Sequence, residues 1–559
     1  MASNTTSFTP SSNGVGEAIV AIASKNIPLT IGIAVVFTFL LNTLLTPRVD
    51  PREPPLIKPS IPLIGHIINL FRYHAEFHRV LSRSFKDKYP IATLQMLNGK
   101  MYAIWDPTLI SSGFKSKHLS THPMIQKYIQ NLMAPSKEGH ALLTGPAGEE
   151  MTNHMMAHVI PQTMRGAHLE KMTNTALRQL CLSLNSLTSS SSSSSLQGSG
   201  PGFQIPNFYL WTRHLLVSAT STALYGKEVN DPFRLNPEME QALFDFEASL
   251  FQLSLGLPFP SLTAKKGHAA REILRRGVEP FYKKKLYDLP EVSEFVRSRA
   301  HTLHKDNLPE DDIPRVEIML PFAAMSNTVP TLFWFLVFVL SSPRETREKL
   351  RREILDSLLV SGGPEINNDS SNEVLLKISQ ILVQEKCPLF YACYRETLRV
   401  AIHQVSSRTV TQDVVLTGQN GMEFLLKKDT QVQMSLGYTH KMEGWWGEDA
   451  DKFRPERWLD SKNAKSAKLA YQPFGGGIHL CPGRYFAFGE MGATIAIFLL
   501  GFDVEPLGGT SGGEWKLPAF RVGSLVDAVS KPVNDAKGFG ITVKPRKGWE
   551  NVTWKVEMA

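Results

Sequence analysis

One cysteine stands in a glycine-rich loop whose composition points to chemistry. Residues 473–484 read PFGGGIHLCPGR, and a mostly apolar run follows at 484–500. Pro482 is a residue type favoured at the first position of a helix, so a helix is predicted to begin beside Cys481. The N–H groups and the dipole at the start of a helix favour the thiolate form of a cysteine.

A thiolate at this position can act as a nucleophile, a zinc ligand or a haem ligand. Zinc needs further ligands at short spacing, whereas Cys181, Cys387 and Cys393 lie far away in the sequence. His479 is close to Cys481 along the chain, which makes it a poor activating base and disfavours a cysteine nucleophile. No Lys-Ser or Lys-Thr pair follows the glycines, which disfavours a phosphate site. A buried structural cysteine is the alternative on this loop alone.

The pattern Phe474-x-x-Gly477-x-x-x-Cys481-x-Gly483 resembles the haem-thiolate signature of the cytochrome P-450 superfamily. The resemblance implies that Cys481 is the axial ligand of the iron of haem b and pushes electron density toward bound oxygen. It also implies that Phe474, Gly477 and Gly483 shape the loop against the porphyrin. His479 matches a position that often supplies a donor to a haem propionate.

Two further motifs lie upstream in the order that this family shows. Glu396 and Arg399 are three residues apart in a predicted helix at 391–400, so they share one helical face. The segment 453–458, FRPERW, resembles the family segment whose arginine closes a buried network behind the haem. The resemblance therefore implies a structural network of Glu396, Arg399 and Arg457, in which loss of one member leaves a buried charge unpaired. An ordinary exposed ion pair is the alternative for the first two.

Contacts to the haem propionates are only partly implied. Arg408 resembles a strand arginine that faces a propionate, as a guanidinium paired with a carboxylate would. Family members place a tryptophan and a basic residue in the region that corresponds to 139–160. This chain has no tryptophan there, and His140, His154 and His158 are its only candidate cations. The sequence therefore does not assign the propionate contact expected from the region 139–160.

Residues 317–340 form the longest apolar segment after the N-terminal region. A second membrane span is one interpretation of its length. The segment contains Pro321, Asn327 and Pro330, and we favour a buried helix that crosses the body over the distal face of the haem.

The residues expected at the distal face depart from the usual family pattern. Most family members carry an acid followed by threonine where this chain has Ser326 and Asn327. The pattern around Asn327 resembles the branch that contains sterol 7α- and 12α-hydroxylases and prostacyclin synthase. An amide can hold a water near bound oxygen, and the hydroxyls of Ser326 and Thr328 can assist, so these three are the candidate catalytic residues. The alternative is that Asn327 only caps a helix break at Pro330.

Composition is consistent with a large folded enzyme. The chain has 559 residues, of which 42% are hydrophobic and 20% charged, and its four cysteines form no disulfide framework. The net charge of +8 is spread among acidic residues, which disfavours nucleic-acid binding and favours a membrane surface or an acidic redox partner. The resemblance to the cytochrome P-450 superfamily implies a fold that is mainly α with small β-sheets.

The N-terminal region predicts a membrane anchor. Residues 1–26 are polar and contain a glycosylation sequon at Asn4. Residues 27–45 carry no charge and are long enough to cross the bilayer at about 1.5 Å per residue. They lack a clear cleavage site, which disfavours a signal peptide. Basic residues are more numerous after the run, so the tail is predicted in the lumen of the endoplasmic reticulum and the catalytic body in the cytosol.

The remainder divides into a spacer and one catalytic domain. Repeated prolines at 46–62 predict a hinge, and 63–559 is the predicted haem-thiolate domain. A serine run marks a low-complexity insertion at 186–202. The apolar loop 256–260 precedes a basic predicted helix at 265–288, so it is a candidate to dip into the bilayer, with an ordinary core loop as the alternative.

The predicted function is monooxygenation of a bulky hydrophobic substrate, sterol-like or terpenoid, in the specialised metabolism of a eukaryote such as a fungus. Electrons would come from NADPH through a cytochrome reductase, with cytochrome b5 as a further donor. The alternative within enzymes is an isomerase or dehydratase that rearranges a peroxide without a reductase. A non-catalytic membrane haem carrier is the third class.

Overall fold

The computed structural model describes residues 48–59, 65–85, 89–96, 99–189, 202–362, 373–379, 385–460, 467–507, 515–521, 523, 526–533 and 537–558. Of the predicted anchor, it describes only separate residues between 31 and 43, which are helical and exposed. Asn4 and the predicted lumenal tail lie outside the described residues.

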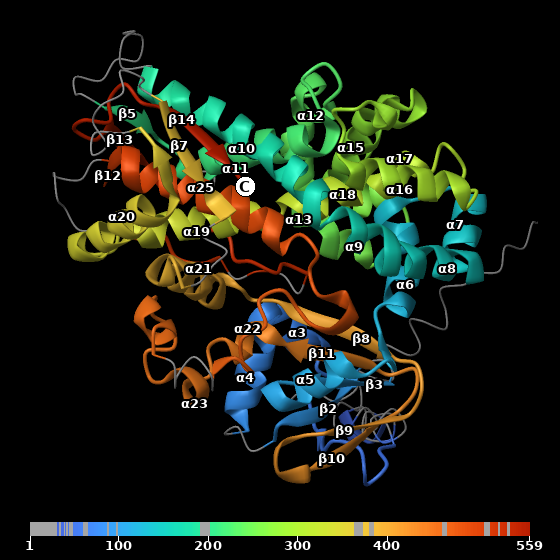
Figure 1. Ribbon diagram of the computed structural model, residues 1–559. Helices are drawn as coiled ribbons and strands as arrows, with labels where there is room; N and C mark the ends of the chain where they lie inside the picture. Colours follow the sequence, from blue (N-terminus) through green and yellow to red (C-terminus); the bar gives the residue numbers. More distant parts are fainter. Residues whose placement is uncertain are drawn as a thin grey trace, which may run out of the picture.

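A sheet-rich lobe and a helix-rich body make up the molecule, with the sheet lobe at the bottom of Figure 1. The lobe is built on a six-stranded sheet in the order β1-β2-β3-β11-β8-β4. Its strands are β1 (Leu56–Ile57), β2 (Ile91–Met96), β3 (Gly99–Ile104), β11 (Gln431–Ser435), β8 (Val405–Val410) and β4 (Leu119–Ser120). The predicted hairpin is confirmed, because β2 and β3 pair antiparallel.

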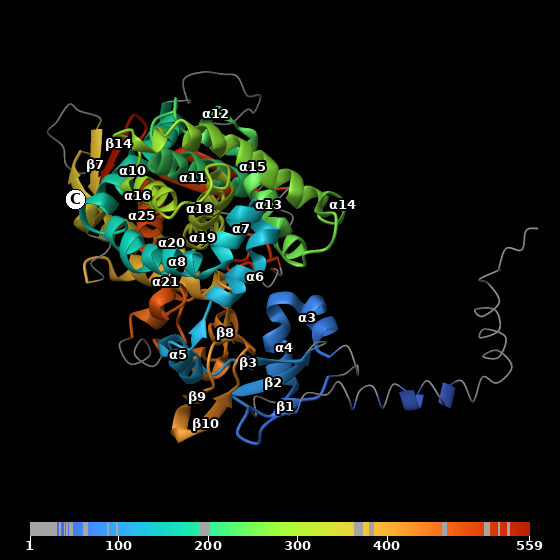
Figure 2. The same ribbon diagram turned by 90° about the vertical axis from the view of Figure 1, so that its right-hand side faces the viewer.

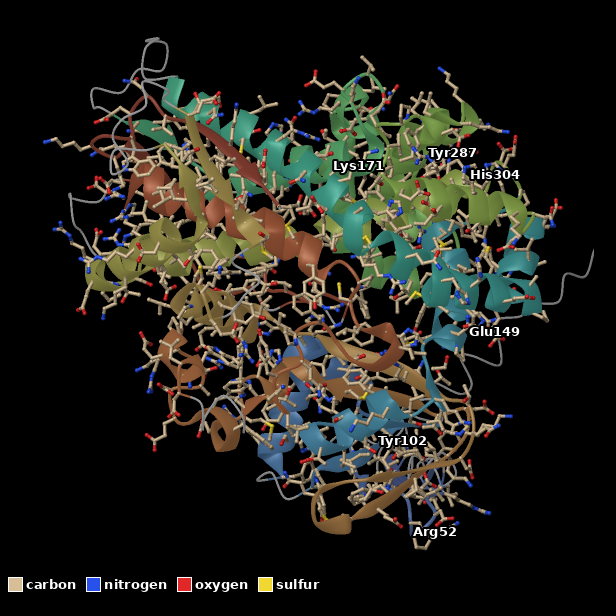
Figure 3. The ribbon with its side chains drawn as sticks, in the orientation of Figure 1. Arg52, Tyr102, Glu149, Lys171, Tyr287 and His304 are labelled. Atoms are coloured by element: carbon tan, nitrogen blue, oxygen red, sulfur yellow. The ribbon has the colours of Figure 1, made fainter. Side chains whose placement is uncertain are left out.

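The sheet also includes part of the segment predicted as a hinge. β1 pairs in parallel with β2, and Thr93 donates its N–H to the Pro55 carbonyl (2.9 Å) and its hydroxyl to the Pro54 carbonyl (2.7 Å). Glu53 is buried and accepts a hydrogen bond from the hydroxyl of Tyr102, which lies inside the lobe (Figure 3). Residues 53–57 of the segment predicted as a Pro-rich hinge therefore pack against the sheet lobe. Prolines lack an N–H, but their carbonyls still accept bonds from the neighbouring strand.

The helical body surrounds one fully buried helix. α19 (Thr328–Leu340) is buried at every residue and packs against α11 (Phe208–Tyr225), α21 (Pro388–Ala401) and α25 (Arg484–Gly501). It continues from α17 (Ile313–Glu317) and α18 (Met319–Met325), so the predicted long helix is divided into consecutive pieces. Among the described residues, one helical run (Ile313–Leu340) is long and apolar enough to cross a membrane, but 83% of its most apolar window is buried in the protein. This burial agrees with the predicted core helix.

The remaining helices cover the core. They are α3 (Ile67–Tyr73), η1 (His74–Glu76), α4 (Phe77–Ser84), α5 (Pro107–Lys115), α6 (His122–Met133), α7 (Lys137–Thr144), α8 (Pro146–His154), the π-helical η2 (Met155–Val159), α9 (Ile160–Thr163), α10 (Gly166–Ser189), α12 (Pro232–Leu235), α13 (Glu238–Ser254), α14 (Pro260–Thr263), α15 (Lys265–Lys283), η4 (Leu286–Asp288), α16 (Glu294–Lys305), α20 (Arg344–Leu358), η6 (Gln419–Gly421), α22 (Leu436–Thr439), α23 (Glu443–Trp446), η7 (Pro455–Trp458) and η8 (Gly477–His479).

Small sheets complete the body. β12 (Phe502–Pro506), β13 (Ile541–Pro545) and β5 (Phe203–Ile205) form one, and β14 (Thr553–Glu557), β7 (Glu373–Lys377) and β6 (Leu359–Ser361) form another. The pair β9 (Val414–Thr417) and β10 (Glu423–Leu426) extends from the lobe. Of the predicted insertion at 186–202, α10 continues to Ser189, and residues 190–201 lie outside the described residues. The predicted fold class, mainly α with small sheets, is confirmed.

Candidate active site

The loop that carries Cys481 lies between η8 and the start of α25. The Cys481 N–H donates to the Phe474 carbonyl (3.1 Å), which closes the loop. α25 begins at Arg484, so Pro482 precedes the helix rather than opening it. Burial raises the pKa of the Cys481 thiol, while the N–H groups of Gly483 and Arg484 act in the opposite direction. A cation bonded to the sulfur would complete the stabilisation of the thiolate.

Glycines in this loop are required by a close approach to α5. Gly477 has φ +64°, and a Cβ there would lie 2.1 Å from the carbonyl oxygen of Phe114. A Cβ on Gly476 would lie 2.7 Å from the Phe114 ring. A side chain at either position would push the loop away from the sheet lobe.

A cavity of about 240 Å³ opens above the cysteine loop. The loop contributes Pro473, Phe474, Cys481, Pro482 and Gly483, and α18, α19 and the residues between them contribute Leu320, Ala323, Ala324, Asn327, Thr328 and Thr331. Other walls include Met164, Leu224, Phe295, Leu398, Ile402, Gln404, Ala528 and Val529. The lining is mostly apolar, so the cavity suits a hydrophobic cofactor and substrate.

The helix over this cavity is interrupted at Ser326 and Asn327. Pro330 has no N–H and cannot donate to the Ser326 carbonyl, which explains the interruption. Asn327 makes no side-chain cap at the start of α19, so the capping alternative is not what the structure has. Asn327 and Thr328 line the same cavity as Cys481, whereas Ser326 is only 2% exposed and is not part of the lining.

The structure brings Glu396, Arg399 and Arg457 together in a buried network. Glu396 Oε1 accepts from Arg457 Nε (2.9 Å), and both carboxylate oxygens accept from Arg399 (2.8 and 2.9 Å). Trp458 Nε1 and the Arg454 N–H also donate to this carboxylate, each at 2.9 Å. Both oxygens of the Glu396 carboxylate are thus satisfied by hydrogen-bond donors, which is the condition for a buried charge to be stable.

The network reaches the cysteine loop through a histidine. Arg399 Nη1 donates to the His440 carbonyl (2.7 Å), and His440 Nε2 accepts from the N–H of Gln472 (3.0 Å), which directly precedes the loop. Burial lowers the pKa of His440 to about 3, so its ring is neutral and can accept this bond. Glu396 and Arg399 therefore brace the segment that leads to Cys481.

Arg408 is a buried cation without an acidic partner among the described residues. It is 7% exposed, and burial lowers its pKa to about 10. Its Nη1 donates only to the Ser406 hydroxyl (2.9 Å) and the Ser407 carbonyl (2.8 Å). The charge of Arg408 also lowers the pKa of His479, after the larger effect of burial, and Thr121 Oγ1 lies 3.3 Å from His479 Nε2. An anionic group such as a haem propionate would supply what Arg408 lacks.

The histidines in the region 139–160 do not reach the cavity. His154 and His158 are exposed, with ring centroids 5.2 Å apart, and His140 is half-buried away from the lining. Sequence reasoning missed His122, whose ring nitrogens are both buried with no hydrogen-bond partner among the described residues. It also missed Gln404, which lines the cavity. Its position two residues after Ile402 in an extended segment could have indicated that both side chains face the same side.

These features define a class of protein. A thiol at the floor of an apolar cavity, a buried arginine that needs an anion and a helix-rich body fit a haem-thiolate protein. The family model described as Cytochrome P450 matches residues 54–514, so the chain belongs to the cytochrome P450 family. It is an oxidoreductase with haem b as its cofactor.

Relatives extend over nearly the whole chain. A cytochrome P450 monooxygenase of Gibberella zeae is 31% identical, with 94% of this chain and 96% of the relative covered. Cytochrome P450 7B1 of Mus musculus is 25% identical, with 85% and 90% covered. A 5-beta-cholestane-3-alpha,7-alpha-diol 12-alpha-hydroxylase of Sus scrofa is 23% identical, with 85% and 90% covered. Such relatives support a haem monooxygenase.

A solved structure supports the fold. Retinoic acid-bound cyanobacterial CYP120A1 superposes with a TM-score of 0.61 at 17% identity, with 88% of this chain and 99% of that chain covered.

Proposed function

We propose that this protein is a membrane-bound monooxygenase of a bulky hydrophobic substrate, sterol-like or terpenoid, that takes electrons from NADPH through a cytochrome reductase. The observation that carries the proposal is that Cys481, Asn327 and Thr328 line one mostly apolar cavity. The relative from Sus scrofa is named for a cholestane diol, which supports a sterol-like substrate.

Each residue has a distinct part in the proposed reaction. Thiolate-ligated haem supplies oxygen activation and transfer of one oxygen atom to the substrate. Cys481 would be the iron ligand, and Arg408 and His479 would bind the propionates. The Asn327 amide, which has no hydrogen-bond partner among the described residues, holds and orients a water at the distal face. The Thr328 hydroxyl donates to the Ala324 carbonyl (2.9 Å), so it can only accept a bond from that water.

An apolar surface patch supports membrane association of the body. Its exposed side chains are Ile68 and Phe71 on α3 and Leu255, Leu257, Phe259 and Leu262 at and before α14. The Phe71 ring contacts that of Phe251 in α13 at 5.2 Å, which makes the patch continuous, and Figure 2 shows α3 and α14 on one side. The basic residues Lys265 and Lys266 follow it. This patch would lie in the endoplasmic reticulum membrane beside the proposed anchor, with Asn4 in the lumen.

Reconstitution tests the proposed reaction. The purified holoprotein is combined with a cytochrome reductase, NADPH and ¹⁸O₂, and a panel of sterols and terpenoids is screened for products that contain one labelled oxygen atom. The proposal expects a labelled alcohol that requires both NADPH and the reductase. Turnover of a fatty acyl hydroperoxide without either component, and no labelled product, would support the peroxide-rearranging alternative instead.

A further inference from the structure

Polar side chains are few on the distal walls of the cavity. Those of the described residues are Asn327, Thr328, Thr331 and Gln404. The Thr328 hydroxyl donates to Ala324, and the Thr331 hydroxyl donates to the Asn327 carbonyl (2.7 Å). Each threonine hydroxyl therefore donates its only proton to the backbone carbonyl four residues earlier, and has none left for a ligand. The amides of Asn327 and Gln404 are left as the groups that can donate to a bound molecule.

The direction of the Gln404 side chain follows from its neighbours. Ile402 and Gln404 both line the cavity, while His403 between them points the other way, with Nε2 3.1 Å from Lys441 Nζ and Nδ1 3.4 Å from Glu76 Oε1. Alternate residues of an extended chain face opposite sides, so the Gln404 side chain shares the cavity face with Ile402.

The backbone holds this residue in place. The Gln404 carbonyl accepts from the N–H of Gly437 (2.9 Å), and Ile402 bridges to Val529, which also lines the cavity. A Cβ on Gly437 would lie 2.5 Å from the Cα of His403, so the two segments are in close contact. The amide is thus presented from a rigid wall rather than from a mobile loop.

Gln404 is separate from the propionate end of the site. The same face of the strand continues through Ser406 to Arg408, and at a rise of about 3.3 Å per residue Gln404 lies about 13 Å from Arg408. Its amide makes no hydrogen bond to another described residue. A half-buried amide among Ile402, Ala528 and Val529 gains most from a ligand that brings one oxygen to it.

We infer that the Gln404 amide is a specificity-determining anchor, which binds a single hydroxyl or carbonyl oxygen of an otherwise apolar substrate. The inference rests on the proposed function and narrows its substrate class to oxygenated molecules. One fixed hydrogen bond at the wall would set which carbon of the substrate faces the iron.

Spectral titration of the holoprotein tests this anchor. Cholesterol is compared with cholest-5-ene, and farnesol with farnesene, so that each pair differs in one hydroxyl. Wild type is expected to bind at least one alcohol about tenfold more tightly than its hydrocarbon partner. Gln404→Met keeps the side-chain length and should abolish that preference. Gln404→Leu is the second variant if the first does not fold. Thr331→Val is the control. It removes a hydroxyl that already donates to the Asn327 carbonyl, so the preference for the alcohol should remain.

Two results would overturn the anchor. One is a wild type that shows no preference within either pair, and the other is a preference that persists in both Gln404 variants. Each protein is also reduced and treated with carbon monoxide. A wild type without the thiolate-type band would count against the proposed function, whereas a normal band without an alcohol preference would count against the anchor alone.

Discussion

The two sides of the cavity differ in how their polar groups are bonded. On the cysteine side, the Glu396 carboxylate accepts bonds from Arg399, Arg457, Trp458 and the Arg454 N–H. On the distal side, Asn327 presents an amide that has no partner among the described residues. Both sides are built from helices and loops of the same body.

This difference separates scaffold from ligand contact. A buried charge whose bonds are all filled by protein holds the structure and has no capacity left for a ligand. An amide without a protein partner at a cavity wall can bind a ligand or water. Arg408 belongs with the second group, because it is buried but lacks an acidic partner among the described residues.

Glu396→Ala should give the largest loss of stability. It leaves Arg399 and Arg457 buried without their carboxylate, so the free energy of unfolding should fall by about 3–5 kcal/mol. Urea denaturation of the holoprotein measures this. Glu345→Ala removes an exposed partner of Lys349 and should cost less than about 0.5 kcal/mol. Equal effects of the two substitutions would refute the scaffold role.

Glu490 on α25 is an exception on the cysteine side and predicts a pH dependence. It accepts from the Thr220 hydroxyl (2.8 Å), but its Oε2 has no partner among the described residues, and burial raises its pKa to about 8. The folded state then holds a proton that the unfolded state releases above about pH 4.5. Stability should therefore fall as the pH rises toward 8, by up to about 1.4 kcal/mol per pH unit.

Glu490→Gln removes the titrating group while keeping the side-chain shape. Its unfolding free energy should decline less than that of wild type between pH 6 and 8, as measured by urea denaturation at each pH. Parallel curves for the two proteins would show that Glu490 is ionised in the folded state.

Arg408→Met should weaken haem retention without breaking a protein ion pair. Loss of a charge-assisted bond to a propionate is expected to speed haem transfer to apomyoglobin about tenfold. Arg408→Lys keeps the charge, so its rate of haem transfer should lie between those of wild type and Arg408→Met. If haem leaves all three proteins at the same rate, Arg408 does not face the cofactor.

Asn327→Ala should have the smallest effect on stability and a selective effect on turnover. Its amide has no partner to lose among the residues that the structure describes, so the unfolding free energy should change by less than about 0.5 kcal/mol. The yield of product per NADPH consumed should fall several-fold, because the distal water loses its anchor. Asn327→Thr supplies a hydroxyl and should retain more of this coupling. An unchanged yield in Asn327→Ala would show that the amide does not act in turnover.

Short motifs were the part of the site that sequence could predict. Cys481 and the pair Glu396 and Arg399 lie in contiguous segments, where spacing alone fixes which side chains share a face. Arg457 lies further along the chain, and only the resemblance to a family connected it to them. The structure shows that His440 links this network to the cysteine loop. None of the sequence motifs predicted this link.

Side-chain direction at breaks and in irregular strands was not predictable. Ser326 and Asn327 are neighbours at an interrupted helix, and only one of them reaches the cavity. The face that Gln404 presents depends on contacts of His403 with residues distant in sequence. The strand at 56–57 could not be predicted either, because it depends on pairing with β2, which begins more than 30 residues later.

The most direct test is the absorbance spectrum of the reduced protein with carbon monoxide. Sulfur ligation by Cys481 predicts a band at about 450 nm in wild type, and Cys481→Ala should lose it. A wild type without this band, or a Cys481→Ala variant that keeps it, would contradict the assignment of Cys481 as the haem ligand.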